Sequence, residues 1–195
     1  PHYLLSKQSV DDRALNRTVY AALQAHLPER PLRVVEVGAG IGSMPVRLLR
    51  WGLLRQAEYV AVDEMAGNID FARGWIPQQA ASLGWQAVEQ AGGGLHLSAP
   101  EGELNLELRT GDLFEFLGSG TPPFDLLIAN AVLDLLPLPE SLPRLFACLK
   151  PGGLAWLTIN FDGLTGFEPA IDPELDERIE RLYHRTMDER PGGGD

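Results

Sequence analysis

The chain has 195 residues, 45% of them hydrophobic, which is enough to bury one ordinary core. Its net charge of −11 argues against a nucleic-acid partner, because an acidic surface repels phosphates. A lone cysteine, Cys148, cannot form a disulfide framework or a cysteine metal cluster, and no stretch has the length and apolarity of a membrane span. We therefore expect one cytoplasmic domain over residues 1–195, with no metal ion and no membrane contact.

Residues 1–30 predict a helical arm. Apolar residues recur at helical spacing between Asp11 and Leu27, and Pro28 ends the pattern. The preceding segment, Tyr3 to Ser9, is polar and aromatic. Two interpretations stay open for it: a loosely packed terminal arm, or a cover over a pocket with Tyr3 and Lys7 as candidate ligand contacts.

A strand, a glycine turn and a helix follow in immediate succession. Arg33 to Val37 is a short apolar run typical of a buried parallel strand, and Pro45 to Trp51 returns to helical spacing. Three alternating glycines, Gly38, Gly40 and Gly42, join the two. Glycine permits positive φ and close approach of a ligand to the backbone, and the helix start presents free N–H groups. The pattern predicts a nucleotide-binding unit, with a purely structural turn as the alternative.

An acidic residue ends the next strand. Asp63 follows Glu58 to Val62 and lies 21 positions after Gly42. A carboxylate at this strand end can accept hydrogen bonds from both ribose hydroxyls. The spacing E-x-G-x-G-x-G that begins at Glu36 matches the dinucleotide fingerprint G-x-G-x-x-G poorly.

Alternating and periodic segments continue along the chain. We expect a helix from Glu64 that Pro77 interrupts or kinks, a second helical segment over Trp75 to Val88, and a hairpin of Leu95–Ser98 with Leu104–Leu108. The remaining predicted elements are a strand over Asp125–Asn130, a helix over Glu140–Leu149, a strand over Leu154–Asn160, a loop over Phe161–Pro173 and a charged helix over Pro173–Glu189. On that last helix, Tyr183 and His184 are the only candidates for substrate contact.

Five motifs in order resemble those of the class I S-adenosylmethionine-dependent methyltransferases, over roughly residues 33–160. They are Val35–Gly42, Val62–Asp63, Thr110–Phe114, Phe124–Asn130 and Leu149–Gly153. The resemblance implies an α/β fold with a doubly wound, mostly parallel sheet of the Rossmann-like type. It implies S-adenosyl-L-methionine as cofactor, and a division into an arm (1–30), a cofactor-binding core (31–160) and a truncated loop and helix (161–195).

The resemblance also assigns residues to the cofactor. The implied contacts are Glu36, Gly38, Ala39, Gly40, Asp63, Glu64, Met65, Asp112, Leu113 and Asn130. For Asp112, the alternative is an N-cap of a helix that begins at Leu113. For Asp134, which stands where many small-molecule relatives carry a histidine base, three roles stay open: a base, a site for a cationic amine, or a cap.

The function that the resemblance implies is methyl transfer to a small-molecule acceptor. A non-catalytic cofactor-binding module and a nicotinamide-dependent oxidoreductase are the alternatives. Nothing after Asn160 alternates like a strand, so we expect the family's final antiparallel hairpin to be missing. The strand over Leu154–Asn160 would then form an uncovered edge that favours a homodimer.

Overall fold

A seven-stranded sheet forms the centre of the molecule in a computed structural model that describes residues 1–118, 120–159 and 165–189. Its strand order is β3-β4-β5-β2-β1-β6-β7, and all neighbours pair in parallel except β3–β4 and β4–β5. The strands are β1 (Leu32–Val37), β2 (Gln56–Asp63), β3 (Gln86–Glu89), β4 (Leu95–Ala99), β5 (Gly102–Thr110), β6 (Phe124–Asn130) and β7 (Leu149–Thr158). The predicted mostly parallel α/β sheet is confirmed.

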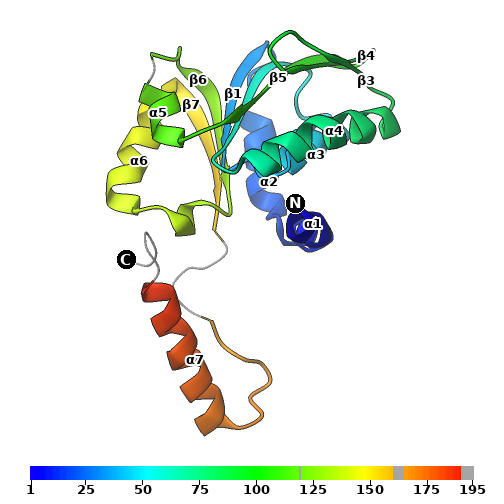
Figure 1. The fold of residues 1–195 in the computed structure, drawn as a ribbon. Coiled ribbons are helices and arrows are strands. Elements are labelled where there is room, and N and C mark those ends of the chain that lie inside the picture. Colours follow the sequence, from blue (N-terminus) through cyan, green and yellow to red (C-terminus); the bar gives the residue numbers. More distant parts are fainter. Residues whose placement is uncertain (119, 160–164, 190–195) are drawn as a thin grey trace.

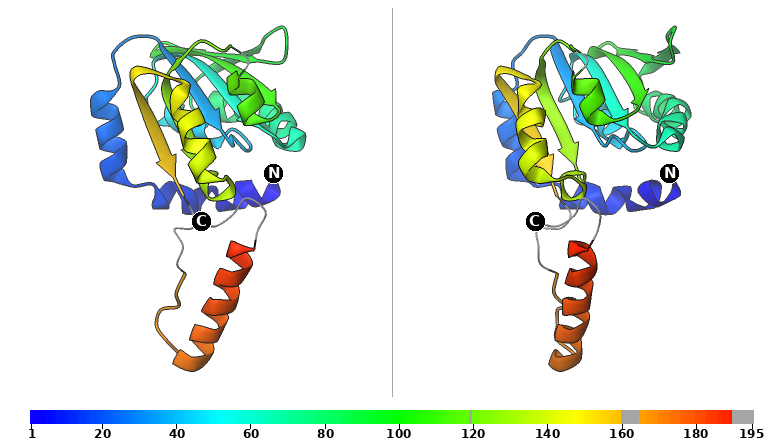
Figure 2. Two further views of the ribbon diagram at one scale, coloured as in Figure 1. Left: turned by 90° about the vertical axis from the view of Figure 1, so that its left-hand side faces the viewer. Right: turned by 60° about the vertical axis from the view of Figure 1, so that its left-hand side comes forward.

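Helices cover both faces of this sheet (Figure 1). One face carries α2 (Arg17–His26), α3 (Ser43–Arg50) and α4 (Ala66–Ser82), and the other carries α5 (Leu113–Gly118) and α6 (Leu138–Ala147). Beyond the carboxyl ends of the strands lie α1 (His2–Ala14) and α7 (Pro173–Asp188), as both views of Figure 2 show. Among the helices described, none is long and apolar enough to cross a membrane.

The core has two parts, one on each face of the sheet. The strands of the centre contribute alternately to both, because successive side chains of a strand point to opposite faces. Val34 of β1 packs toward the α3–α4 face, for example, and its neighbour Val35 toward the α5–α6 face. This packing fixes the carboxyl ends of β1, β2 and β6 relative to one another.

The amino-terminal prediction is wrong in its boundaries. Two helices replace the single expected helix, and residues Tyr3 to Ser9, expected to precede it, belong to the first of them. The break falls at Asn16, whose side chain accepts hydrogen bonds from the backbone N–H groups of Thr18 and Val19 at 2.9 and 3.2 Å. Such an N-cap starts a new helix and allows the chain to change direction.

Pro77 does not interrupt its helix, contrary to the prediction. One helix, α4, runs through it, since four residues on its inner face are fully buried: Ile69, Ala72, Ile76 and Ala80. Burial of that stripe outweighs the backbone hydrogen bond that proline cannot donate. The expected helical segment up to Val88 is also wrong, because the helix ends at Ser82 and Gln86–Glu89 form β3 beside β4.

The hairpin of β4 with β5, the strand β6 and the helix α7 are confirmed. The helix expected over Glu140–Leu149 begins and ends two residues earlier, as α6. The last strand, β7, starts earlier than expected, at Leu149, so the Lys150–Gly153 turn lies within its bounds. Within residues 165–189, which the structure describes after β7, α7 is the only regular element; Asn160 and the first part of the expected loop lie outside the described residues.

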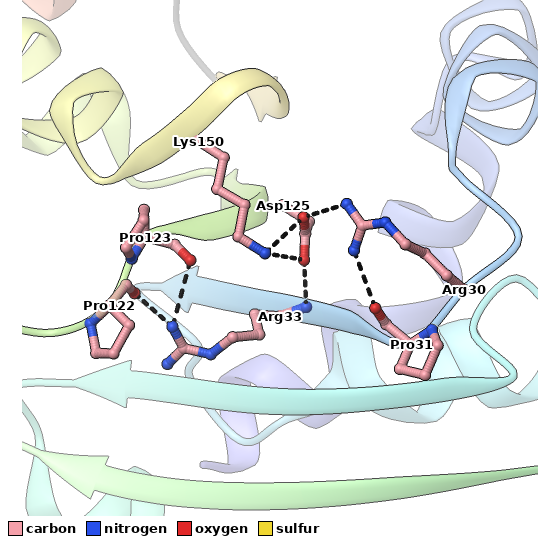
Figure 3. A network of polar contacts seen from close by, with 7 residues as sticks. All are labelled: Arg30, Pro31, Arg33, Pro122, Pro123, Asp125 and Lys150. Atoms are coloured by element: carbon pink, nitrogen blue, oxygen red, sulfur yellow. Dashed lines mark hydrogen bonds and ion pairs between the residues drawn. The ribbon is translucent and has the colours of Figure 1, made fainter.

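A buried carboxylate ties three segments together at the amino end of the parallel strands (Figure 3). Asp125 on β6 accepts hydrogen bonds from Arg30 Nη2 at 2.7 Å, the Arg33 backbone N–H at 2.8 Å and Lys150 Nζ at 2.9 Å. These three donors hold the carboxylate in its charged form and keep the pKa of Asp125 well below its usual range, although burial acts in the opposite direction.

Candidate functional site

A cavity of about 630 Å³ opens at the carboxyl ends of β1 and β6. The glycine loop forms one wall, and the ends of β6 and β7 form another. Its cover comes from α1 and the carboxyl end of α7. Volumes of this order suit a cofactor or a drug-sized molecule, and the crevice outside the strand ends is where parallel α/β sheets bind ligands.

The glycine loop cannot accommodate side chains. Gly38, Gly40 and Gly42 all have positive φ (66°, 56° and 73°). A Cβ on Gly38 would lie 2.7 Å from Val132, and one on Gly42 would lie 2.5 Å from Ile76. The loop therefore needs its glycines for its own conformation and packing, and the same geometry exposes its backbone to the cavity at Gly38, Ala39 and Gly40.

Asp63 fastens this loop to the start of α4. Its Oδ2 accepts a hydrogen bond from the Gly40 N–H at 2.7 Å, while its Oδ1 accepts from the Met65 N–H and from Asn68 Nδ2. A carboxylate has about four lone-pair sites, so one acceptor site stays available for a further donor. Asp63 thus organises the loop in addition to the expected ribose contact.

Glu36 is a buried acid at the floor of the cavity, with 4% of its surface exposed. Burial raises its pKa to about 8; the hydrogen bond from Tyr59 Oη at 2.7 Å and the nearby Arg47 oppose this effect, and Asp63 adds to it. The carboxyl group is therefore largely protonated at neutral pH in the ligand-free protein. A cation brought into the cavity would favour its ionised form and release a proton.

Replacing Glu36 with glutamine is expected to change how stability depends on pH. A carboxyl whose pKa is raised by folding stabilises the fold at low pH, and this contribution disappears as pH rises from its unfolded value near 4.5 to about 8. Without ligand, the wild type should lose on the order of 2 kcal/mol relative to E36Q between pH 5 and pH 7. Urea unfolding at both pH values, with the exposed Glu89→Gln as control, measures this difference; parallel curves for wild type and E36Q would contradict it.

Arg47 joins the cavity to the amino-terminal helix. It is 7% exposed, lies on α3, and forms an ion pair through Nε with Asp12 of α1. Its Nη1 lies 3.3 Å from Ser43 Oγ, and its Nη2 has no hydrogen-bond partner among the described residues. A buried guanidinium with a free N–H edge is a ready site for a carboxylate.

Asn130 and Asp134 stand at the opposite wall. The Oδ1 of Asn130 accepts a hydrogen bond from Thr158 Oγ1 at 3.1 Å, which leaves its Nδ2 without a partner in the described structure. The Oδ1 of Asp134, on the short 3-10 helix η1 (Leu133–Leu135), is likewise buried and without a partner among these residues. Two residues that line the cavity thus each have one buried polar atom, a donor and an acceptor, without a partner among the described residues.

The other predicted cofactor residues lie outside the cavity lining. Glu64, Met65, Asp112 and Leu113 follow β2 and β5, whose ends are joined by the hydrogen bond from Gly111 N–H to the Asp63 carbonyl. None of the four lines the cavity, and Met65 is 60% exposed. Asp112 caps α5, accepting from the N–H groups of Phe114 and Glu115 at 2.7 and 2.8 Å, so the capping alternative is present in the structure.

Several cavity residues had weak or no sequence signals. Tyr3, Lys7 and Tyr183, which the sequence suggested only as candidates, all line the cavity; His184 instead accepts a hydrogen bond from the Thr165 N–H. The sequence could have indicated that Tyr59 lies near Glu36. Two-residue periodicity places Tyr59 on the same face of β2 as Ala61, and Ala61 is the register partner of Glu36. The Arg47–Asp12 contact spans 35 positions and no local pattern indicates it.

Comparison with known proteins identifies the type of fold. No protein-family profile and no curated protein matches the sequence. Among solved structures, a Haloferax volcanii candidate methyltransferase in complex with the Trm112 methyltransferase activator is similar over 82% of this chain and 58% of its own (TM-score 0.53, 18% identity). A candidate methyltransferase from Bacillus halodurans C-125 is similar over 87% of this chain and 57% of its own (TM-score 0.50, 15% identity).

The parallel strand order with the glycine loop after β1 defines a Rossmann-like α/β protein. More specifically, the chain has the fold of the class I S-adenosylmethionine-dependent methyltransferases. It spans somewhat more than half the length of each of these two structural neighbours.

Proposed function

We propose that this chain binds S-adenosyl-L-methionine and transfers its methyl group to a small-molecule acceptor. The observation that carries the proposal is the cavity itself: it lies over the glycine loop, and three residues that line it, Arg47, Asn130 and Asp134, each have a buried polar atom without a partner among the described residues. These atoms fit an amino-acid moiety and an acceptor better than they fit an empty structural crevice, because buried polar groups normally have partners.

The charged side chains of the cavity match the charges of the cofactor's methionine moiety. The Arg47 Nη2 is suited to the carboxylate of the methionine moiety, and the acidic Glu36 to its ammonium group. The exposed backbone of Gly38 and Gly40 would let that moiety approach, and the spare acceptor site of Asp63 is suited to a ribose hydroxyl. Met65, Leu113 and Asp112, which lie outside the cavity lining, are proposed to contact the adenine.

Bound S-adenosyl-L-methionine supplies an electrophilic methyl carbon that needs no further activation. The protein must hold the acceptor in line with that carbon and exclude water. The helix α1 covers one side of the cavity, and Asp134, which lines it, would accept a proton from the acceptor. Much of the rate would come from positioning.

Two measurements test this proposal. Calorimetry should show binding of S-adenosylhomocysteine with release of a proton near pH 7, because the cationic ligand favours ionised Glu36. Incubation of the protein with methyl-labelled S-adenosyl-L-methionine and a small-molecule library should then give a labelled product. Binding without any transfer would favour a non-catalytic cofactor-binding module, and absence of binding would refute the proposal.

We also propose that the protein forms a homodimer through β7. This strand lies at the end of the sheet and pairs with β6 on one side, and no described strand pairs with its other side. Unpaired N–H and C=O groups on an edge strand recruit another strand. Light scattering should give twice the chain mass, and the amides of Leu154–Thr158 should exchange more slowly as the protein concentration rises. A monomer at all concentrations would contradict this proposal.

A further inference from the structure

Resting on the methyl-transfer function proposed above, we propose that the acceptor is an amine with an apolar, ring-sized body, bound through its ammonium group at Asp134. The inference comes from two features of the cavity lining after the ends of β6 and β7. Asp134 lines the cavity and has a buried oxygen, Oδ1, without a partner among the described residues, and a rim of large apolar side chains lines the cavity with it.

The rim consists of four large apolar side chains from four separate segments. They are Tyr3 of α1 (71% exposed), Leu135 of η1 (56%), Ile159 directly after β7 (49%) and Tyr183 of α7 (41%), and all four line the cavity. Scattered apolar residues on a surface are ordinary, but their convergence on one opening marks a binding surface. An acceptor with an apolar body would cover the rim, whereas a sugar or another highly polar acceptor would gain little from it.

The charges of the cavity favour a cation. Its positively charged side chains, Lys7 and Arg47, each have an acid of α1 beside them: Lys7 Nζ lies 3.5 Å from Asp11, and Arg47 pairs with Asp12. Asp134 has no such partner among the described residues, and its Oδ1 is buried. An unpaired buried carboxylate oxygen is costly, and an ammonium group is the partner that relieves most of that cost.

The aromatic rings strengthen the same preference. The faces of Tyr3 and Tyr183 carry negative partial charge and attract cations. The free N–H of Asn130 could serve a neutral or anionic acceptor, but it stands beside the strand end that the cofactor is proposed to occupy.

The transfer step follows from this placement. The bound ammonium first gives one proton to the Asp134 carboxylate, which leaves a neutral amine with a lone pair. That pair forms the new N–C bond as the C–S bond breaks and its electrons stay on sulfur, producing S-adenosylhomocysteine and a methylated ammonium. One proton per transfer remains with Asp134 and passes to solvent.

Three matched probes test the assignment on protein saturated with S-adenosylhomocysteine: 2-phenylethylamine, 2-phenylethanol and phenylacetate. They share a ring and differ in charge, and ethanolamine serves as an amine without a ring. Calorimetry should show the aromatic amine binding about tenfold tighter than either other aromatic probe, as expected for one charge-assisted hydrogen bond. Ethanolamine should bind at least tenfold more weakly than 2-phenylethylamine.

Two variants assign the effect to residues. Asp134→Asn should remove the preference for the amine while binding S-adenosylhomocysteine as the wild type does, and Leu135→Ser should weaken all three aromatic probes alike. The exposed Glu140→Gln on α6 controls for overall charge and should behave as the wild type. Tighter binding of phenylacetate, or of the alcohol, by cofactor-loaded wild type would overturn this inference alone, whereas failure to bind S-adenosylhomocysteine would overturn the proposed function.

Discussion

Replacing Asp63 with alanine is expected to weaken S-adenosylhomocysteine binding by about a hundredfold. The substitution removes the carboxylate proposed to accept from the ribose, and charge-assisted hydrogen bonds contribute roughly 1.5–3 kcal/mol. It also removes the acceptor for the Gly40 and Met65 N–H groups and for Asn68 Nδ2, so the glycine loop loses its attachment to α4. Calorimetry on wild type and D63A measures the change.

Two comparisons separate these effects. Asn68→Ala removes one donor to Asp63 and keeps the carboxylate, so it should weaken binding by less than tenfold. A cofactor analogue without ribose hydroxyls should lose less affinity in D63A than S-adenosylhomocysteine does, and the loss that remains measures the effect of the detached glycine loop. The exposed Asp70→Ala on α4 is the control for charge and helix stability. Equal affinity of D63A and wild type for S-adenosylhomocysteine would refute the cofactor assignment. So would binding of NAD to the wild type as tightly as S-adenosylhomocysteine.

The central architecture could be predicted because its signals are local. The strand β1 is a continuous apolar run, β5 alternates with period two, and a glycine loop of fixed spacing follows β1. Each of these patterns depends on neighbours in sequence, so no tertiary contact is needed to recognise it. The same reasoning placed Glu36, Gly38 and Asp63 at one edge of the sheet.

The errors arose where tertiary packing or a single cap decides. Pro77 would end an isolated helix, yet the buried face of α4 carries the helix past it. Gln86–Glu89 became a strand because β4 lies beside it, which periodicity over a few residues cannot indicate. In the site, Arg47 was missed because its partner Asp12 belongs to a helix that folds back over the loop. The Asp112 side chain caps α5, the alternative that the sequence had left open, and its contact with the cofactor stays a prediction.

The largest expected effect on stability comes from Asp125→Ala, far from the cavity. The Asp125 side chain is 4% exposed and receives two cations and one backbone N–H (Figure 3). Removing it leaves the Arg33 N–H without its partner at the start of β1, and Arg30 and Lys150 must turn to solvent. Breaking a buried ion pair typically costs 3–5 kcal/mol. Because both cations are partly exposed and can be rehydrated, we expect about 3 kcal/mol, or a fall in Tm of roughly 6–12 °C for a chain of this size.

The pH dependence of this loss distinguishes a charge effect from a packing effect. The pKa of Asp125 is lowered by folding, so its contribution is fully present above the unfolded value near 4 and declines as pH falls below it. The stability difference between wild type and D125A should therefore be constant between pH 6 and 8 and shrink toward pH 3.

Glu177→Ala, which removes an exposed pair with Arg181 on α7, should cost less than about 0.5 kcal/mol at every pH. S-adenosylhomocysteine should bind folded D125A with unchanged affinity, since the network lies at the opposite end of the strands. A difference that stays constant down to pH 3 would show that Asp125 stabilises the fold through packing and not through its charge.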